Sequence, residues 1–212
     1  MLLAGLVCAL AAACGTDAGS RAHRGTASGG TVTGAPAASA RVDVDTPALR
    51  ALRRRAGLAP CPAATATPPR TGGLPEVTLP CLGGGRDVRL SALRGPLVVN
   101  LFAQWCGPCR AELPSYQRLH EAGAGRVRVL GLDYLDTRPG GALALAATTG
   151  VTYPLVADPG GTVRTAFRTR GLPGVVLVDA RGRVVDVEYR VMSSYAELRS
   201  LVEQRLHVRL PA

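Results

Sequence analysis

The sequence predicts an α/β fold in which a central mixed β-sheet is flanked by helices. Three observations support it. Short apolar runs alternate with helical patterns from residue 97 onwards, two Cys separated by two residues follow the first long apolar run, and a hairpin pattern precedes a final helical segment. The 212 residues suit one domain, with about sixty residues left over at the usual domain size.

The chain begins with a short apolar segment, residues 2–13. This segment is too short to span a bilayer and is typical of a secretory signal. Small residues before Cys14 favour cleavage of residues 1–13 and lipidation of that Cys, with cleavage without lipid or no processing as alternatives. Residues 14–45 are rich in Gly, Ala, Ser and Thr and predict a flexible tether. We therefore expect an extracytoplasmic protein, either anchored by lipid to the outer face of the bacterial cytoplasmic membrane or secreted.

Residues 46–73 predict a short helix and a loop that precede a domain at residues 74–212. Thr46 is a suitable N-cap, Pro47 suits the first helical position, and Gly57 is placed to end the helix. The helix carries the densest basic cluster of the chain, formed by Arg50, Arg53, Arg54 and Arg55. This cluster is expected either to face solvent or to contact anionic lipid headgroups.

The domain begins with two alternating runs, 76–80 and 86–90, around three glycines, and these predict an N-terminal β-hairpin. A near-continuous apolar run at 97–102 predicts a central strand with both faces covered. The helix after the two Cys should be kinked at Pro114. The remaining elements are expected as strands 127–132, 155–156, 174–179 and 184–189, and as helices 142–148, 162–167 and 195–207.

The net charge of +10 is divided between the two parts of the chain. Residues 15–75 hold eight Arg against three Asp, and residues 76–212 hold seventeen Arg against twelve acidic residues, so the domain is only mildly basic. Nucleic-acid binding needs a basic face interleaved with aromatic residues, which make up only 4% of this chain. We expect no nucleic-acid partner.

The most specific motif is the run from Trp105 to Cys109, WCGPC, at a predicted helix start. The partial positive charge and free amides of a helix N-terminus stabilise a thiolate. We therefore expect Cys106 to be the exposed nucleophile and Cys109 to be the buried thiol that resolves a mixed disulfide. Trp105, Gly107 and Pro108 are expected to contact the substrate.

Two other uses of this Cys spacing are weaker. Half of a zinc site would need a second CxxC, CxxH or HxxxH pair, which the sequence does not contain, so we expect no metal. Covalent c-type haem attachment is excluded because Arg110, and not His, follows Cys109. We expect no cofactor.

Residues 74–212 resemble the TlpA and ResA group of extracytoplasmic thioredoxin-like thiol-disulfide oxidoreductases, which is related to CcmG of cytochrome c maturation. The resemblance rests on LVVNLFAQWCGPCRAELP at 97–114 and GLPGVVLVDARGRVV at 171–185. It implies a thioredoxin-like fold, a cis peptide at Pro173 that faces the Cys pair, and a Leu172 backbone that pairs with a substrate strand. An ordinary loop proline is the alternative for Pro173.

The resemblance also implies a proton carrier for Cys109, because a buried thiol must lose its proton before it attacks. Ordinary thioredoxins have an Asp where this chain has Asn100, which cannot accept a proton. In the TlpA and ResA group the acid lies three residues after the second Cys, which here is Glu112. A solvated Glu paired with an Arg is the alternative. The Gly-Pro dipeptide departs from many members and favours a low reduction potential.

Cys61 and Cys81 lie before the domain and after the first hairpin run. In an oxidising compartment we expect them to form a structural disulfide that joins the N-terminal helix to the domain. A second redox pair or two free thiols are the alternatives.

Together these features predict a thiol-disulfide oxidoreductase, monomeric and membrane-anchored, that acts on protein disulfides or dithiols. A reductase, for example in cytochrome c maturation, is favoured over a disulfide-forming oxidase, and a membrane electron donor of the CcdA or DsbD type would recharge it. The alternative from another class is a lipoprotein binding module in which Cys106 and Cys109 form a non-catalytic disulfide.

Overall fold

The computed structural model describes residues 41–63 and 68–211 of the chain. The predicted signal at 1–13, Cys14 and most of the predicted tether lie outside these ranges. Of the helices in the described ranges, none has the length and apolar character needed to cross a membrane.

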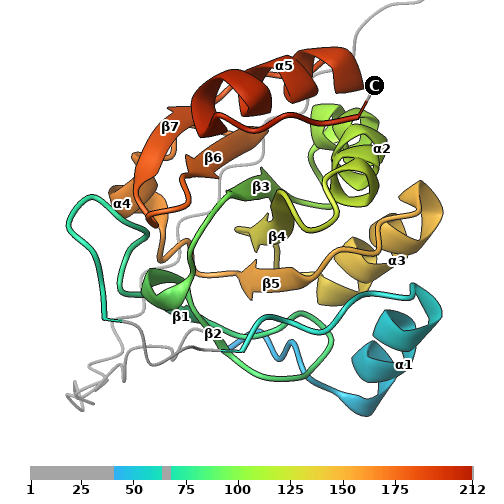
Figure 1. The fold of residues 1–212 in the computed structure, drawn as a ribbon. Helices are drawn as coiled ribbons and strands as arrows, with labels where there is room; N and C mark the ends of the chain where they lie inside the picture. The colour runs from blue at the N-terminus through green and yellow to red at the C-terminus, as the bar shows by residue number, and fades with distance from the viewer. Residues whose placement is uncertain (1–40, 64–67, 212) are drawn as a thin grey trace, which may run out of the picture. The chain divides into compact units, whose positions relative to one another are not determined.

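A five-stranded mixed sheet forms the centre of the fold (Figure 1). The strands lie in the order β5-β4-β3-β6-β7, with β3, β4 and β5 parallel, β6 antiparallel to β3, and β7 antiparallel to β6. Their bounds are β3 Leu97–Phe102, β4 Arg128–Tyr134, β5 Leu155–Asp158, β6 Gly174–Val178 and β7 Val184–Glu188. This sheet with its helices confirms the predicted thioredoxin-like α/β fold.

Three helices cover one face of the sheet, and α5 lies beside α2 (Figure 1). Their bounds are α2 Gly107–Ala122, α3 Pro139–Thr149 and α5 Tyr195–Leu206. The other face is covered by the short helix α4, Arg164–Phe167, by a 3-10 turn, Leu90–Ala92, and by the hairpin. Successive side chains of a strand point to opposite faces, so Val98 joins one core and Val99 the other. This explains why the run at β3 is apolar throughout except for one Asn.

The predicted hairpin forms a separate two-stranded antiparallel sheet of β1, Thr78–Leu79, and β2, Val88–Arg89. The paired strands are shorter than the predicted runs. An isolated antiparallel bridge between Cys81 and Val156 attaches the end of β1 to the edge strand β5. The hairpin therefore lies against β5, the strand at that edge of the central sheet.

Helix α1, Pro47–Arg55, begins where the sequence predicts. The Thr46 side chain caps it by accepting a hydrogen bond from the backbone N–H of Leu49 at 3.2 Å. Leu49 is buried in the same core as Val44, which is the fourth residue of the described part. The packed region therefore begins inside the predicted tether 14–45, because Val44 has apolar neighbours to bury against.

Two arginines of the basic cluster bind other groups of this protein. The Arg53 guanidinium donates to the carbonyl oxygen of Leu82 at 2.9 Å and to that of Ala59. Arg50 forms a bidentate pair with the carboxylate of Asp45, at 2.6 and 3.0 Å. The cluster as a whole is therefore not a free basic face, because half of it has protein partners.

Several bounds differ from the expected ones, those of β5, α4, β6, β7 and α5 by one or two residues. Helix α3 begins at Pro139, before the expected 142–148, because a proline in the first turn loses no helical hydrogen bond. Strand β4 continues to Tyr134, two residues past 127–132. Helix α2 contains Pro114 in its interior, where the sequence predicts a kink.

Cys61 and Cys81 form a disulfide with an S–S distance of 2.04 Å and a sequence separation of 20. It joins the segment after α1 to the segment after β1, which is the arrangement expected for a structural bridge.

Replacing both Cys61 and Cys81 by Ser is expected to lower the free energy of unfolding by about 3 kcal/mol, because the unfolded chain loses a cross-link across a loop of this size. Urea unfolding of the oxidised proteins measures the change. Replacing Cys106 and Cys109 by Ser provides the control, since their disulfide spans a sequence separation of only 3 and should contribute less. A loss of under about 0.5 kcal/mol would contradict a structural role.

Candidate active site

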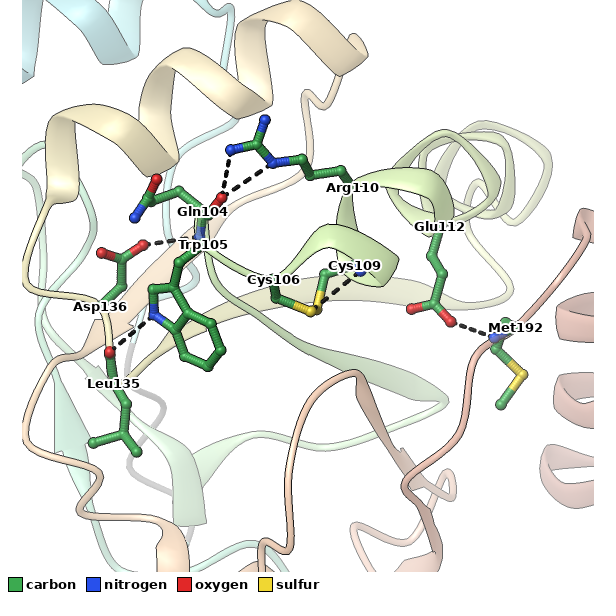
Figure 2. The surroundings of a disulfide bond; sticks show 9 residues. All are labelled: Gln104, Trp105, Cys106, Cys109, Arg110, Glu112, Leu135, Asp136 and Met192. Atoms are coloured by element: carbon green, nitrogen blue, oxygen red, sulfur yellow. Dashed lines mark hydrogen bonds between the residues drawn. A yellow bond between two sulfur atoms is a disulfide. The ribbon is translucent and has the colours of Figure 1, made fainter. Parts of the chain in front are cut away.

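The WCGPC motif lies where β3 leads into α2 (Figure 2). Cys106 is the N-cap of α2, and its sulfur accepts a hydrogen bond from the backbone N–H of Cys109 at 3.2 Å. The two residues are joined by a disulfide. The helix amide that meets the sulfur of Cys106 in this form is the kind of donor that stabilises a thiolate after reduction.

The two cysteines are both covered in the disulfide form. Cys106 is 5% exposed and Cys109 is 1% exposed. The prediction of an exposed Cys106 is therefore wrong for this form, since the sulfur of Cys106 is bonded to Cys109 and turned toward the N-terminus of α2. Its neighbours Trp105, Gly107 and Pro108 are exposed, and Trp105 most clearly, at 52%. These three residues form the exposed surface next to the disulfide.

The segment before Cys106 is held by hydrogen bonds that the sequence did not predict. The indole N–H of Trp105 donates to the carbonyl oxygen of Leu135 at 3.2 Å (Figure 2). The backbone N–H of Gln104 donates to the Asp136 carboxylate at 2.8 Å. The Gln104 carbonyl accepts two hydrogen bonds from the Arg110 guanidinium, at 2.7 and 3.1 Å.

The place of Asp136 beside the motif could have been predicted from its position directly after a strand. Asp136 follows β4, and β4 is parallel to β3, which leads into the motif. The carboxyl ends of parallel neighbouring strands share one edge of a sheet, where ligand and catalytic groups gather. Polar residues directly after β4 are therefore candidates for contact with the motif.

Glu112 lies one helical turn after Cys109, on the side of the disulfide away from Trp105 (Figure 2). Its side chain is 1% exposed, and one carboxylate oxygen accepts a hydrogen bond from the backbone N–H of Met192. The other oxygen has no hydrogen-bond partner among the described residues. The alternative of a solvated Glu paired with an Arg is therefore wrong.

The environment of Glu112 favours its neutral form. Burial raises the pKa of Glu112 from 4.5 to about 7, against the lowering effect of the Met192 N–H, while the charge of Glu197 raises it further and that of Arg190 lowers it. A carboxyl group with a pKa near neutrality is suited to take up and release a proton.

Asn100 occupies the middle of β3 and is buried. Its side-chain N–H donates to the hydroxyl of Tyr153 at 3.3 Å, and its side-chain oxygen has no partner among the described residues. Because an amide does not titrate near neutral pH, this position supplies no proton acceptor.

The Leu172–Pro173 peptide is cis. Pro173 directly precedes β6, and the antiparallel register places Gly174 opposite Leu101 of β3. This register puts Pro173 beside the end of β3 from which the motif emerges. Leu172, which directly precedes Pro173, is partly exposed.

Of the site residues predicted from the sequence, the Cys pair, Trp105 and Glu112 lie together, and the register brings Pro173 to the same edge. Cys61 and Cys81 form their own disulfide beside β5. Within residues 41–63 and 68–211, no three His, Cys, Asp or Glu side chains gather as they would around a metal ion.

The chain is similar in sequence to proteins named as thiol:disulfide interchange proteins. The chain is 35% identical over 113 residues to the thiol:disulfide interchange protein DsbE homolog of Paracoccus denitrificans, covering 52% of this chain and 59% of that protein. It is 33% identical over 114 residues to the thiol:disulfide interchange protein HelX of Rhodobacter capsulatus, covering 52% and 62%. The alignments thus span about three fifths of these relatives.

Among solved structures, MTB dsbF in its mixed oxidized and reduced forms superposes with a TM-score of 0.55 and 27% identity, covering 61% of this chain and 94% of that one. The AhpC/TSA family model matches residues 73–187, which include the Cys pair, Glu112 and Pro173. That match extends over more than half of the chain, and the chain therefore belongs to the AhpC/TSA family.

Proposed function

We propose that this protein is an extracytoplasmic thiol-disulfide oxidoreductase that reduces disulfides in other proteins, for example during cytochrome c maturation. The observation that best supports it is the Cys106–Cys109 disulfide at the N-terminus of α2, with the buried carboxyl group of Glu112 one turn along the same helix. The names of the thiol:disulfide interchange relatives point to the same chemistry.

The reaction uses the dithiol form of the protein. The Cys106 thiolate attacks one sulfur of the substrate disulfide, and the other substrate sulfur leaves as a thiolate. Cys109 then gives its proton to the Glu112 carboxylate and attacks the Cys106 sulfur of the mixed disulfide. The second substrate thiolate leaves, two electrons have passed to the substrate, and the Cys106–Cys109 disulfide remains.

The exposed surface around the motif is the proposed contact for the substrate protein. Trp105, Gly107 and Pro108 present it from the helix start, and the backbone of Leu172 before the cis Pro173 would pair with an extended substrate segment. The support for this role is the exposure of the first three residues and the position of Pro173 beside the end of β3.

Each turnover consumes the dithiol, so the protein needs a source of electrons. We infer a membrane electron donor of the CcdA or DsbD type, which would reduce the disulfide by the same exchange chemistry. Such a donor fits a monomer tethered to the outer face of the cytoplasmic membrane through a lipidated Cys14. Intact-mass measurement of the protein extracted from membranes would reveal the lipid on Cys14.

The reduction potential distinguishes the reductase from the oxidase. We expect a value near or below roughly −250 mV, in the range of reducing thioredoxins. Equilibration of the protein with glutathione buffers measures it through the emission of Trp105, the single Trp of the chain, which adjoins the disulfide. A potential near about −120 mV, where strong oxidants lie, would favour the disulfide-forming oxidase instead. A pair that does not exchange with the buffer would favour the binding module.

A further inference from the structure

A pair of buried carboxyl groups, those of Asp133 and Asp136, lies next to the segment that carries Trp105. Asp133 is on β4, in register with Phe102 of β3 and Ala157 of β5. Asp136 follows in the loop toward α3. The two side chains are only 1% and 2% exposed. Two buried carboxylates at close range cannot both ionise without a large cost, so such a pair keeps a proton.

The two carboxyl groups differ in their hydrogen bonds. Asp136 accepts from the backbone N–H of Gln104 at 2.8 Å and from that of Arg138 at 2.9 Å, one on each oxygen. Two amide donors stabilise the charged form of a carboxylate. Of the two groups, Asp136 is therefore the one whose hydrogen-bond donors favour a carboxylate.

Asp133 is in the opposite situation. Neither of its oxygens has a hydrogen-bond donor among the described residues, and the other buried carboxylate of this region, Asp136, lies three residues further along the chain. Two carboxylates cannot bond to each other, whereas a protonated Asp133 can donate its O–H to the Asp136 carboxylate. Burial, followed by the charge of Asp136, raises the pKa of Asp133 well above its usual value, in agreement with a neutral acid.

We propose that Asp133 and Asp136 form a carboxylic acid–carboxylate pair that positions the active-site segment before Cys106. Asp136 holds the N–H of Gln104, while the adjacent Leu135 holds the indole of Trp105. Asp136 acts through Gln104 and is a positioning residue. The effect of the pair on the reaction rests on the proposed function. The sharing of one proton by the two carboxyl groups does not depend on it.

Gln104 is held at both of its backbone polar groups, which belong to two successive peptide groups. Its N–H is held by Asp136, and its carbonyl is held by Arg110 from the first turn of α2. Cys106 follows two residues later. Loss of the carboxylate would release the peptide group before Gln104 while the one after it stays held, and the segment that leads to the nucleophile would shift.

Infrared spectroscopy of the oxidised full chain tests the shared proton. In Glu112→Gln at pH 7 the carbonyl band of a protonated carboxylic acid should remain, because Asp133 keeps its proton and Glu112, whose pKa is raised to about 7, no longer contributes. The band should be absent from the double variant Glu112→Gln, Asp133→Asn. Absence of the band from Glu112→Gln, or its survival in the double variant, would overturn the pair. This readout does not depend on enzymatic activity, so it stands whether or not the proposed function holds.

Steady-state reduction of insulin and Trp105 emission test the positioning role. In Asp136→Asn an amide N–H₂ replaces one carboxylate oxygen, so the backbone N–H of either Gln104 or Arg138 loses its acceptor. We expect kcat to fall about tenfold with KM changed less than twofold, because even a 1 Å misplacement of reacting groups costs up to about a hundredfold. The emission of Trp105 in the oxidised form should shift. Asp87→Asn, at an exposed site in the hairpin, is the control and should match the wild type.

The outcomes separate the two claims. A kcat for Asp136→Asn within twofold of the wild type, or an unshifted Trp105 emission, would overturn the positioning role. A wild type that reduces no insulin contradicts the proposed function, and the emission shift then decides the positioning role by itself.

Discussion

Replacing Cys106 by Ser is expected to lower the reduction of insulin disulfides by more than about 10⁴-fold, the scale on which enzymes lose activity when their nucleophile is removed. The physical reason is that the serine hydroxyl is not ionised at neutral pH, even beside the helix amide that meets the Cys106 sulfur. Stopped-flow or turbidity measurements of insulin reduction, with a chemical reductant as the electron source, provide the rate.

Replacing Cys109 by Ser should have a different effect. Cys106 can still attack a substrate disulfide, but no buried thiol follows to release the product, so a mixed disulfide should accumulate. Non-reducing electrophoresis and mass spectrometry would detect it. The matched control is the double variant Cys61→Ser, Cys81→Ser, which should reduce insulin at the wild-type rate because that disulfide is a separate bridge.

Two results would contradict this assignment. Wild-type activity in Cys106→Ser would mean that the WCGPC pair is not the redox centre. Loss of activity in the Cys61 and Cys81 variant, with its fold intact, would mean that this second disulfide takes part in electron transfer.

Replacing Glu112 by Gln is expected to slow insulin reduction at pH 7 by roughly 10²-fold, the lower end of what a positioned proton acceptor contributes. Gln can still accept the hydrogen bond from the Met192 N–H, but it cannot take a proton from Cys109. The pH–rate profile of the wild type should therefore rise with a midpoint near the pKa of Glu112, about 7, and this rise should be missing in Glu112→Gln. An unchanged profile would show that Glu112 does not titrate in the rate-limiting step.

The same variant should change stability in a pH-dependent way. The folded protein holds the pKa of Glu112 at about 7 and the unfolded chain near 4.5. As pH rises through this window, the unfolded chain has lost its proton while the folded protein still binds it, so the stability of the wild type falls. Above pH 7 the cost is complete and amounts to roughly 3 kcal/mol.

Glu112→Gln removes that titration. It should be more stable than the wild type by up to roughly 3 kcal/mol above pH 7 and should differ little at pH 4. Urea unfolding of the oxidised proteins at both pH values measures the difference. Glu121→Gln, at an exposed site on the same helix, is the matched control and should follow the wild type at both. Equal stability of Glu112→Gln and the wild type at pH 8 would contradict the raised pKa.

Several elements of the fold follow directly from local sequence. The apolar run at Leu97–Phe102 is a buried central strand, since only a strand covered on both faces is apolar on both. Thr46 and Pro47 start helix α1 because capping and a fixed backbone angle act within a few residues. Glu112 shares a helix with Cys109, so their spacing of one turn is set by helical geometry alone.

Other features depend on contacts between distant segments. The burial of Cys106, the packing of Val44 inside the predicted tether, and the hydrogen bonds from Leu135 and Asp136 to the motif all join residues that are far apart in the sequence. Asp133 illustrates this dependence. As a residue in a strand it could face solvent or the core, and only its burial beside Asp136 makes it a neutral acid.

Local sequence patterns predicted the mixed α/β fold and the dithiol motif at a helix start, because periodicity and capping act within a few residues. Glu112 was chosen from the resemblance to the TlpA and ResA group, and helical spacing places it one turn after Cys109. How the segment before Cys106 is held and which carboxyl groups have a raised pKa follow only from the tertiary structure. Those properties depend on the desolvation of each group and on the donors that it meets, and both arise only when separate strands and loops are brought together.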